Sequence, residues 1–136
     1  MRFLLDTNVV SDTMKKAPTP KLLRRISLHE GHLAIASVTW HELRFGVERL
    51  PGGKRREALR EALELWRALV PILDYDANAA DWHARQRARL LSAGRTEQLF
   101  DGQIAAVAAT RRLTLVTANT KHFRHYADLT LADWSV

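Results

Sequence analysis

The sequence predicts an α/β fold in which a mostly parallel central sheet is flanked by helices. Two observations predict it. Short apolar segments typical of strands alternate along the chain with longer amphipathic segments typical of helices. The strand segments are almost wholly apolar, as expected for parallel strands that are covered on both faces. No linker, repeat or low-complexity segment interrupts the 136 residues, so we expect one domain over residues 1–136.

The first part of the chain carries two predicted strands and the connection between them. Residues 3–5 form the first, and residues 32–37, with an apolar stretch at 33–36, form the second; each leads into a polar turn. Residues 20–26 lie between the two and predict a helix with proline at its start. This order is typical of a βαβ crossover.

A helical hairpin is predicted after the second strand. Residues 39–50 and 54–69 form its two arms around the turn Pro51-Gly52-Gly53. In the second arm apolar side chains recur at spacings of four, three and four residues, at Leu59, Leu63, Trp66 and Val70. Such a stripe faces either a core or a partner, and we interpret this one as facing the core.

Two helices and two strands are predicted in the rest of the chain. Residues 70–73 form a third strand, and Asp76 can cap a helix that runs to Ala93, where Gly94 supplies a left-handed stop. Asp101 opens a helix of small residues, and residues 113–117 form a fourth strand. In such a fold the ligand site lies at the carboxyl ends of the strands.

The composition limits the possible classes of function. Lysine and arginine outnumber aspartate and glutamate by 21 to 15, and this excess favours a polyanionic partner such as nucleic acid. The absence of cysteine excludes disulfides, thiolate zinc sites and cysteine nucleophiles, so a metal would bind oxygen or imidazole. No apolar run approaches the roughly 18 residues of a membrane span or forms a signal-peptide core. We therefore expect a cytoplasmic protein that binds no membrane.

Three carboxylates stand where strands and helices meet. Asp6 follows the first strand, Glu42 lies in the first turn of the helix after the second, and Asp101 starts the helix before the fourth. If they converge at one edge of the sheet, they repel one another, by roughly 4 kcal/mol for a pair about 4 Å apart at an effective dielectric constant of 20. A divalent cation would relieve this repulsion, and oxygen ligands suit Mg²⁺ or Mn²⁺. Such an ion can activate water for phosphodiester hydrolysis.

Each carboxylate also has a purely structural interpretation, which the sequence leaves open. Asp6 could cap the helix that follows it, and Glu42 could complete a capping box with Thr39. Asp101 could interact favourably with a helix dipole. The residues alone therefore indicate an acidic metal site in a basic protein, without establishing that the three side chains meet.

Four ordered segments of the chain carry a family resemblance. They are LLDTNVVS at residues 4–11, SVTWHELRFG with ERLP at residues 37–51, DGQIAA at residues 101–106 and LTLVTAN at residues 113–119. In these segments the chain resembles the PIN-domain family and, within it, the VapC-like and FitB-like toxins of type II toxin–antitoxin systems. The resemblance runs nearly from end to end.

The resemblance implies a PIN-like fold and a homodimer that cleaves RNA with Mg²⁺ or Mn²⁺. It also implies inhibition by a cognate antitoxin, which would carry the toxin into a larger complex on operator DNA. The family's catalytic metal ligands fall on Asp6, Glu42 and Asp101 of this sequence. The supporting polar residues of the site fall on Thr7, Asn8, Thr117 and Asn119.

Two further positions bear on this resemblance. His122 stands where the family usually has an acidic residue, so three carboxylates remain for one ion and the binding of a second ion stays open. Gly46 lies inside a predicted helix, where glycine costs about 1 kcal/mol relative to alanine. We expect close packing or a dimer contact to compensate at Gly46.

The main functional hypothesis is an endoribonuclease toxin, and two alternatives stand beside it. One is a structure-specific DNA nuclease, since an acidic metal site acts on phosphodiesters generally. The other is a catalytically weak module that binds nucleic acid or a protein partner. Arg85, Arg87 and Arg89 are candidates to line an RNA path, and a solvated helix face is the alternative for them.

Overall fold

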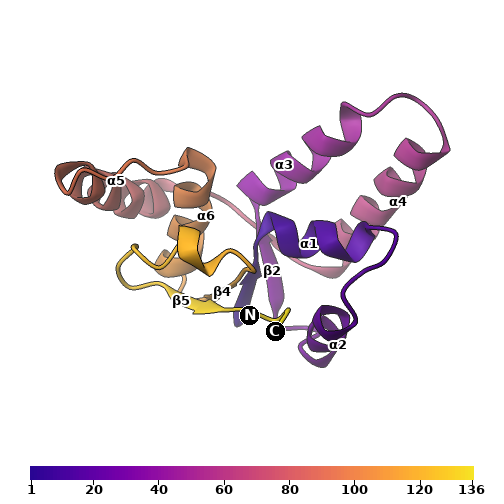
Figure 1. Ribbon diagram of the computed structural model, residues 1–136, viewed down its shortest axis with the longest axis horizontal. Coiled ribbons are helices and arrows are strands. Elements are labelled where there is room, and N and C mark those ends of the chain that lie inside the picture. Colours follow the sequence, from indigo (N-terminus) through magenta and orange to yellow (C-terminus); the bar gives the residue numbers. More distant parts are fainter.

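A five-stranded parallel sheet forms the centre of the computed structural model, which describes residues 1–136 (Figure 1). The strand order is β3-β2-β1-β4-β5, and every neighbouring pair is parallel. The strands are β1 (Phe3–Leu5), β2 (Leu33–Ala36), β3 (Ile72–Leu73), β4 (Thr114–Val116) and β5 (Thr130–Ala132). The predicted α/β class with a parallel central sheet is confirmed.

Strands β1 and β2 are apolar throughout because both of their faces are covered. Successive side chains of a strand point to opposite faces, so Phe3 and Leu5 join one core cluster while Leu4 joins the other. In β2, Ile35 and Ala36 divide between the two clusters in the same way. The chain thus has two cores, one on each side of the sheet.

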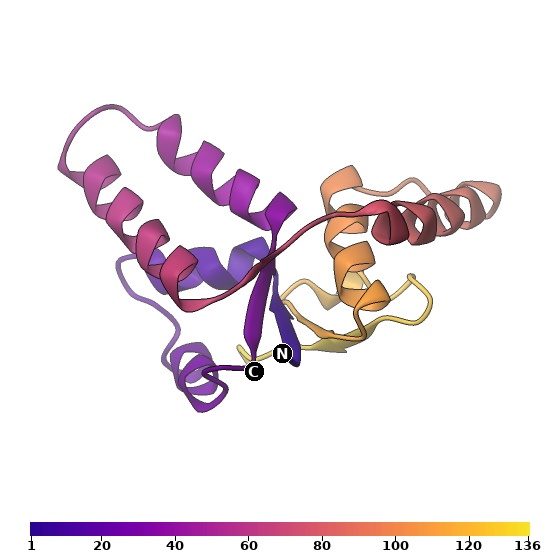
Figure 2. The ribbon, with the colours of Figure 1, turned by 180° about the vertical axis from the view of Figure 1, so that it is seen from behind.

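Helices cover the two faces of the sheet unequally. The core cluster that contains Phe3 and Leu5 is completed by α1 (Thr7–Met14), α2 (Pro20–Leu28), α3 (Ser37–Glu48) and α4 (Lys54–Leu69). The other core cluster is completed by α5 (Ala77–Ser92), α6 (Leu99–Thr110) and the segment after the short 3-10 turn η1 (Thr120–His122). Figures 1 and 2 show these two groups of helices on opposite sides of β1 and β2. None of the helices combines the length and the apolar character that a membrane span requires.

The predicted helix signals act as expected. Pro20 is the first residue of α2, and the side chain of Asp76 caps α5 by accepting a 2.9 Å hydrogen bond from the Ala79 amide. Gly94, just after α5, has a φ of 75°, the left-handed conformation expected of it.

The helical hairpin is also confirmed, and the stripe on its second arm faces the core. Leu63 and Val70 are buried, and Leu59 and Trp66 pack against the same cluster. Gly46 was expected to allow close packing or a dimer contact, but a Cβ atom placed there would meet nothing within 4 Å. Close packing inside the chain is therefore excluded as the reason for Gly46, and a dimer contact remains a prediction.

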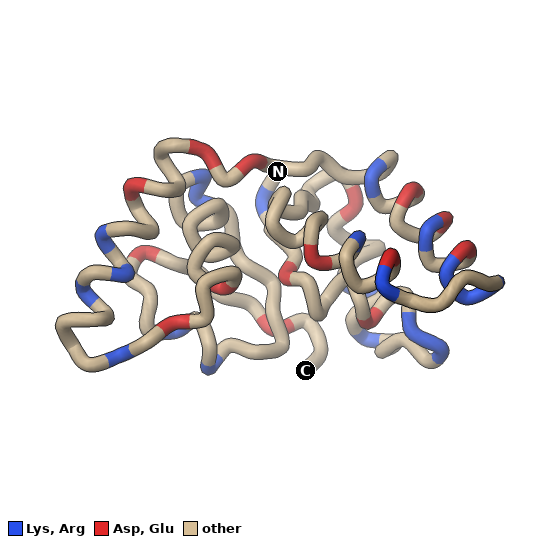
Figure 3. Tube along the Cα trace, turned by 90° about the horizontal axis from the view of Figure 1, so that it is seen from above, with Lys and Arg blue, Asp and Glu red and all other residues tan.

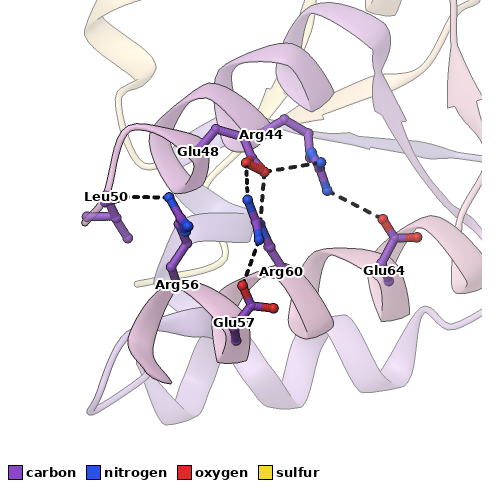
Figure 4. Close-up of polar contacts among 7 residues, drawn as sticks. All are labelled: Arg44, Glu48, Leu50, Arg56, Glu57, Arg60 and Glu64. Carbon is purple, nitrogen blue, oxygen red and sulfur yellow. Dashed lines mark hydrogen bonds and ion pairs between the residues drawn. The ribbon is translucent and has the colours of Figure 1, made fainter. Parts of the chain in front are cut away.

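Ion pairs join the two arms of the hairpin (Figure 4). Arg60 on α4 donates to Glu48 on α3 at 2.7 and 2.9 Å. Arg44 lies between Glu48 and Glu64, at 3.3 and 3.5 Å. The hydrogen bond from Arg60 lowers the pKa of the Glu48 carboxyl. Exposed pairs of this kind contribute little to stability individually, so their main effect is to set how the arms face each other.

Several boundaries differ from the prediction. Helix α3 begins at Ser37 without a side-chain cap, so Glu42 lies in its second turn and the proposed capping box is wrong. The physical reason is that the Thr39 side chain is fully buried, 3.4 Å from the Thr7 hydroxyl, and is not available to cap the helix. Helix α6 begins two residues before Asp101, at Leu99. Strand β5 was not predicted, because this edge strand is half-exposed and lacks an apolar run.

Candidate functional site

The connections of the sheet reverse direction between β1 and β4. The chain leaves β1 toward β2 on one side, while β4 pairs with β1 on the other side. In open α/β sheets the crevice at the carboxyl ends of such strands is the usual ligand site. Asp6 directly follows β1 and Thr117 directly follows β4, and the Thr117 hydroxyl donates a 2.8 Å hydrogen bond to Asp6.

Asp6 is a buried carboxylate with both oxygens engaged. Its Oδ1 atom accepts from the Thr7 amide at 2.8 Å, and its Oδ2 atom accepts from Thr117. The predicted helix-capping role is therefore confirmed, in the form of an N-cap of α1. Burial raises the pKa of Asp6, against the opposing effect of the hydrogen bonds from Thr117 and Thr7.

One cavity brings the three predicted carboxylates together. It has a volume of about 270 Å³ and is lined by Asp6, Thr7, Asn8, Glu42, Gln98, Phe100, Asp101, Asn119, His122 and Phe123. The Thr7 hydroxyl donates to Glu42 at 2.8 Å, so Thr7 contacts two of the carboxylates, through its amide and its hydroxyl. Of the predicted supporting residues, Thr7, Asn8 and Asn119 line the cavity, and Thr117 acts from behind Asp6.

Asp101 carries the clearest electrostatic sign of a cation site. It lies in the first turn of α6 and its pKa is raised to about 6. Burial is the largest cause, and the negative charges of Asp6 and Glu42 add to it. A cavity that disfavours its own ionised carboxylates gains stability when a cation enters.

The donor set fits a hydrated divalent ion. No three acidic or histidine side chains lie close enough together to form a ready-made cage. Mg²⁺, however, usually keeps several of its waters and contacts only one or two carboxylates directly. Asp6, Glu42 and Asp101 around one cavity provide oxygen ligands and charge of the kind this ion prefers.

His122 lies at the mouth of the same cavity. Its Nδ1 atom is 3.7 Å from Oδ2 of Asp101, and 63% of its side chain is exposed. The side chain therefore faces solvent and also borders the carboxylates. A substitution at His122 changes the charge next to Asp101.

The three candidate arginines do not reach the cavity. Arg85, Arg87 and Arg89 are exposed on α5, and none of them lines it. Arg89 donates to Gln86 and to the His125 carbonyl, at 2.7 and 2.8 Å. Figure 3 shows lysine and arginine mainly in the two lateral arms of the molecule and several acidic residues near its middle.

Three residues that line the cavity were not predicted from the sequence, namely Phe123 and the pair Gln98 and Phe100. Gln98 and Phe100 flank the start of α6 and line the cavity beside Asp101. Their closeness to Asp101 in the sequence was the only available signal. It was weak because the predicted helix began at Asp101, which left both residues in a loop of unknown direction.

The fold and the acidic cavity define the class of this protein. Residues 3–129 match the PIN domain family, and the chain belongs to that family. It is 37% identical to the tRNA(fMet)-specific endonuclease VapC of Shigella flexneri, over 99% of each chain. It is 33% identical to toxin FitB of Neisseria gonorrhoeae, over 88% of this chain and 89% of that one.

A solved structure supports the same assignment. A chain of the DNA-bound VapBC complex from Salmonella typhimurium is 30% identical to this one, with a TM-score of 0.89 over 98% of each chain. The resemblance to VapC and FitB toxins is therefore confirmed, together with the PIN fold.

Proposed function

We propose that this chain is a metal-dependent endoribonuclease and the toxin of a toxin–antitoxin pair. The observation that carries the proposal is the convergence of Asp6, Glu42 and Asp101 on one cavity of a PIN fold. Relatives named as ribonucleases and endonucleases support the reaction class. The proposal treats residues 1–136 as a single PIN domain that acts in the cytoplasm as a homodimer.

The residues that line the cavity or lie behind it have different proposed roles. Asp6, Glu42 and Asp101 would hold Mg²⁺ or Mn²⁺, which when bound supplies an activated water and stabilises charge on the phosphate. Thr117 fixes the Asp6 carboxylate and Thr7 fixes Glu42, each through a 2.8 Å hydrogen bond. Asn8 and Asn119 present amide groups to the same cavity, where they can orient water or phosphate oxygens.

Cleavage assays test the proposal. With Mg²⁺ or Mn²⁺ we expect cleavage of single-stranded RNA, and initiator tRNA is the first natural substrate to try because the Shigella relative is named for that specificity. Excess EDTA should stop the reaction, and undiminished cleavage in EDTA would contradict the proposal. Preference for the matching DNA would favour the alternative of a DNA nuclease. Nucleic-acid binding without turnover would favour a catalytically weak module.

A cognate antitoxin is the proposed protein partner. The solved relatives include DNA-bound VapBC complexes, one of them from Rickettsia felis on a DNA fragment from their promoter, and we extend this arrangement to the present chain. A cationic side chain of the antitoxin near Asp6, Glu42 and Asp101 would replace the metal charge. Co-expression with the protein encoded immediately upstream should give a stable complex with suppressed RNA cleavage. Free and fully active toxin in that mixture would contradict the pairing.

The arginines of α5 give a prediction about RNA affinity. If Arg85, Arg87 and Arg89 bind phosphates, their replacement by glutamine should flatten the salt dependence of RNA binding by about one unit of slope for each arginine that binds a phosphate. Arg24→Gln is the matched control, because Arg24 is exposed on α2, which packs on the opposite face of the sheet. An unchanged slope would assign the three arginines to a solvated helix face.

His122 gives a prediction about metal preference. The change His122→Asp adds a carboxylate next to Asp101, so it should lower the Mg²⁺ concentration needed for half-maximal cleavage. The benefit should be smaller with Mn²⁺, which accepts imidazole more readily. His32→Asp serves as the control, because His32 is exposed just before the start of β2 and does not line the cavity. A higher Mg²⁺ requirement in His122→Asp would contradict the placement of His122 at the family's acidic position.

A further inference from the structure

A second polar cluster lies buried behind the acidic cavity. His83 on α5 and Glu97 before α6 are only 4% and 5% exposed, and His83 Nε2 lies 2.6 Å from Oε1 of Glu97. The Tyr126 hydroxyl donates to the other Glu97 oxygen, and the Tyr75 hydroxyl lies 3.0 Å from Nδ1 of His83. We call His83, Glu97, Tyr126 and Tyr75 the His83 cluster. Both oxygens of its buried carboxyl group have partners, as such groups require.

The His83 cluster is in direct contact with the start of α6. Gly102, the neighbour of Asp101, is buried, and a Cβ atom at this position would collide with both His83 and Glu97. The backbone of the first turn of α6 therefore rests on the His83–Glu97 pair. Glu97 also immediately precedes Gln98, the N-cap residue of α6.

The His83 cluster joins two segments that line the acidic cavity. Glu97 precedes the segment of Gln98, Phe100 and Asp101, while Tyr126 follows the segment of Asn119 and His122. The hydrogen bond between Tyr126 and Glu97 thus links the segment of Asp101 to the segment of Asn119 and His122. Burial raises the pKa of the Tyr126 hydroxyl, and the bond to Glu97 adds to this effect, so the hydroxyl stays a donor.

We propose that His83, Glu97 and Tyr126 are positioning residues that set where Asp101 stands relative to Asp6 and Glu42. This inference rests on the proposed function, because it assigns the cluster to the metal site of that function. The three carboxylates do not lie close enough together to form a complete set of metal ligands. Small displacements of the turn that carries Asp101 therefore change its distance from Asp6 and Glu42, and with it the metal affinity. The His83 cluster is the structure that limits such displacements.

Two variants test the proposal by different routes. Tyr126→Phe keeps the aromatic ring in the core and removes only the hydroxyl that holds Glu97. Gly102→Ala keeps every hydrogen-bonding group and pushes α6 away from His83 and Glu97. Alanine raises helix propensity, so lower metal affinity in Gly102→Ala points to displacement of α6 and not to a weaker helix.

The control is Asp76→Ala. Asp76 follows Tyr75 and caps the helix that carries His83, but its side chain bonds to Ala79 and Arg111, so its loss lowers stability while the bonds of Glu97 to His83 and Tyr126 stay in place. Mn²⁺ affinity is measured by calorimetry at a temperature where circular dichroism shows all variants folded. We expect Tyr126→Phe and Gly102→Ala to weaken Mn²⁺ binding by about tenfold, the lower end of the roughly 10- to 100-fold range typical when an outer-shell metal partner is removed. Asp76→Ala should stay close to wild type.

A second readout keeps this inference separate from the proposed function. In metal-free protein, hydrogen exchange of the Gly102 amide, which bonds to the Gln98 carbonyl at 3.1 Å, should speed up in Tyr126→Phe and not in Asp76→Ala. If wild type binds no Mn²⁺, the proposed function fails, and the exchange rate alone decides whether the cluster positions the turn. A lower melting temperature with unchanged Mn²⁺ affinity and unchanged exchange would overturn the proposal and leave the cluster a purely structural element.

Discussion

Asp101→Asn is expected to remove metal-dependent cleavage and, at the same time, to stabilise the metal-free protein. Asparagine keeps the shape of the side chain but lacks the charge that burial and Asp6 disfavour. A carboxyl pKa moved from 3.8 to about 6 corresponds to at most about 3 kcal/mol of stability at neutral pH. The loss of cleavage should exceed the roughly 10- to 100-fold typical of outer-shell metal partners, because Asp101 would bind the ion itself.

The pH dependence of stability provides the check on Asp101→Asn. Because its folded-state pKa is raised, Asp101 holds its proton to a higher pH in the folded protein than in the unfolded chain. The free energy of unfolding of the wild type should therefore fall as pH rises from about 4 through about 6, and this fall should be smaller in the variant. Urea unfolding in EDTA at pH 4.5 and pH 7.5 measures it. If Asp101→Asn is less stable at pH 7.5, the helix-dipole role dominates instead.

Substitutions of Asp6 are expected to affect both cleavage and stability, because Asp6 has a structural role as well. Asp6→Ala should abolish cleavage and also lower the free energy of unfolding by about 1–3 kcal/mol. The change removes the N-cap of α1 and leaves the buried Thr117 hydroxyl without its acceptor. Asp6→Asn should abolish cleavage at a smaller cost, since its amide oxygen can still accept one of the two hydrogen bonds.

Urea unfolding and cleavage assays on both Asp6 variants test this expectation. Asp76→Ala is the matched control, because it removes the N-cap of α5 and leaves the acidic cavity unchanged. It should lose stability of the same order, about 1 kcal/mol, and keep its cleavage activity. An active Asp6→Ala variant would show that Asp6 serves only as a cap.

Much of the candidate site could be predicted from the sequence. Asp6, Glu42 and Asp101 stand out by their places next to strands and by family resemblance, and they do share one cavity. Of the structural roles suggested for these carboxylates, one is confirmed and one is wrong. The N-cap role of Asp6 is real and coexists with its place in the cavity, whereas the capping box of Thr39 and Glu42 does not form.

The sequence by itself determined the features that depend on neighbouring residues. Apolar strands covered on both faces, Pro20 at the start of a helix, the Asp76 cap and the turn at Gly94 all follow from local stereochemistry and hydrophobic pattern. The tertiary structure alone decided which distant side chains meet. The Thr117–Asp6 hydrogen bond spans 111 residues, and the Tyr126–Glu97 bond joins segments on either side of β4. Such contacts depend on how helices and sheet pack, and local propensity carries no information about that packing.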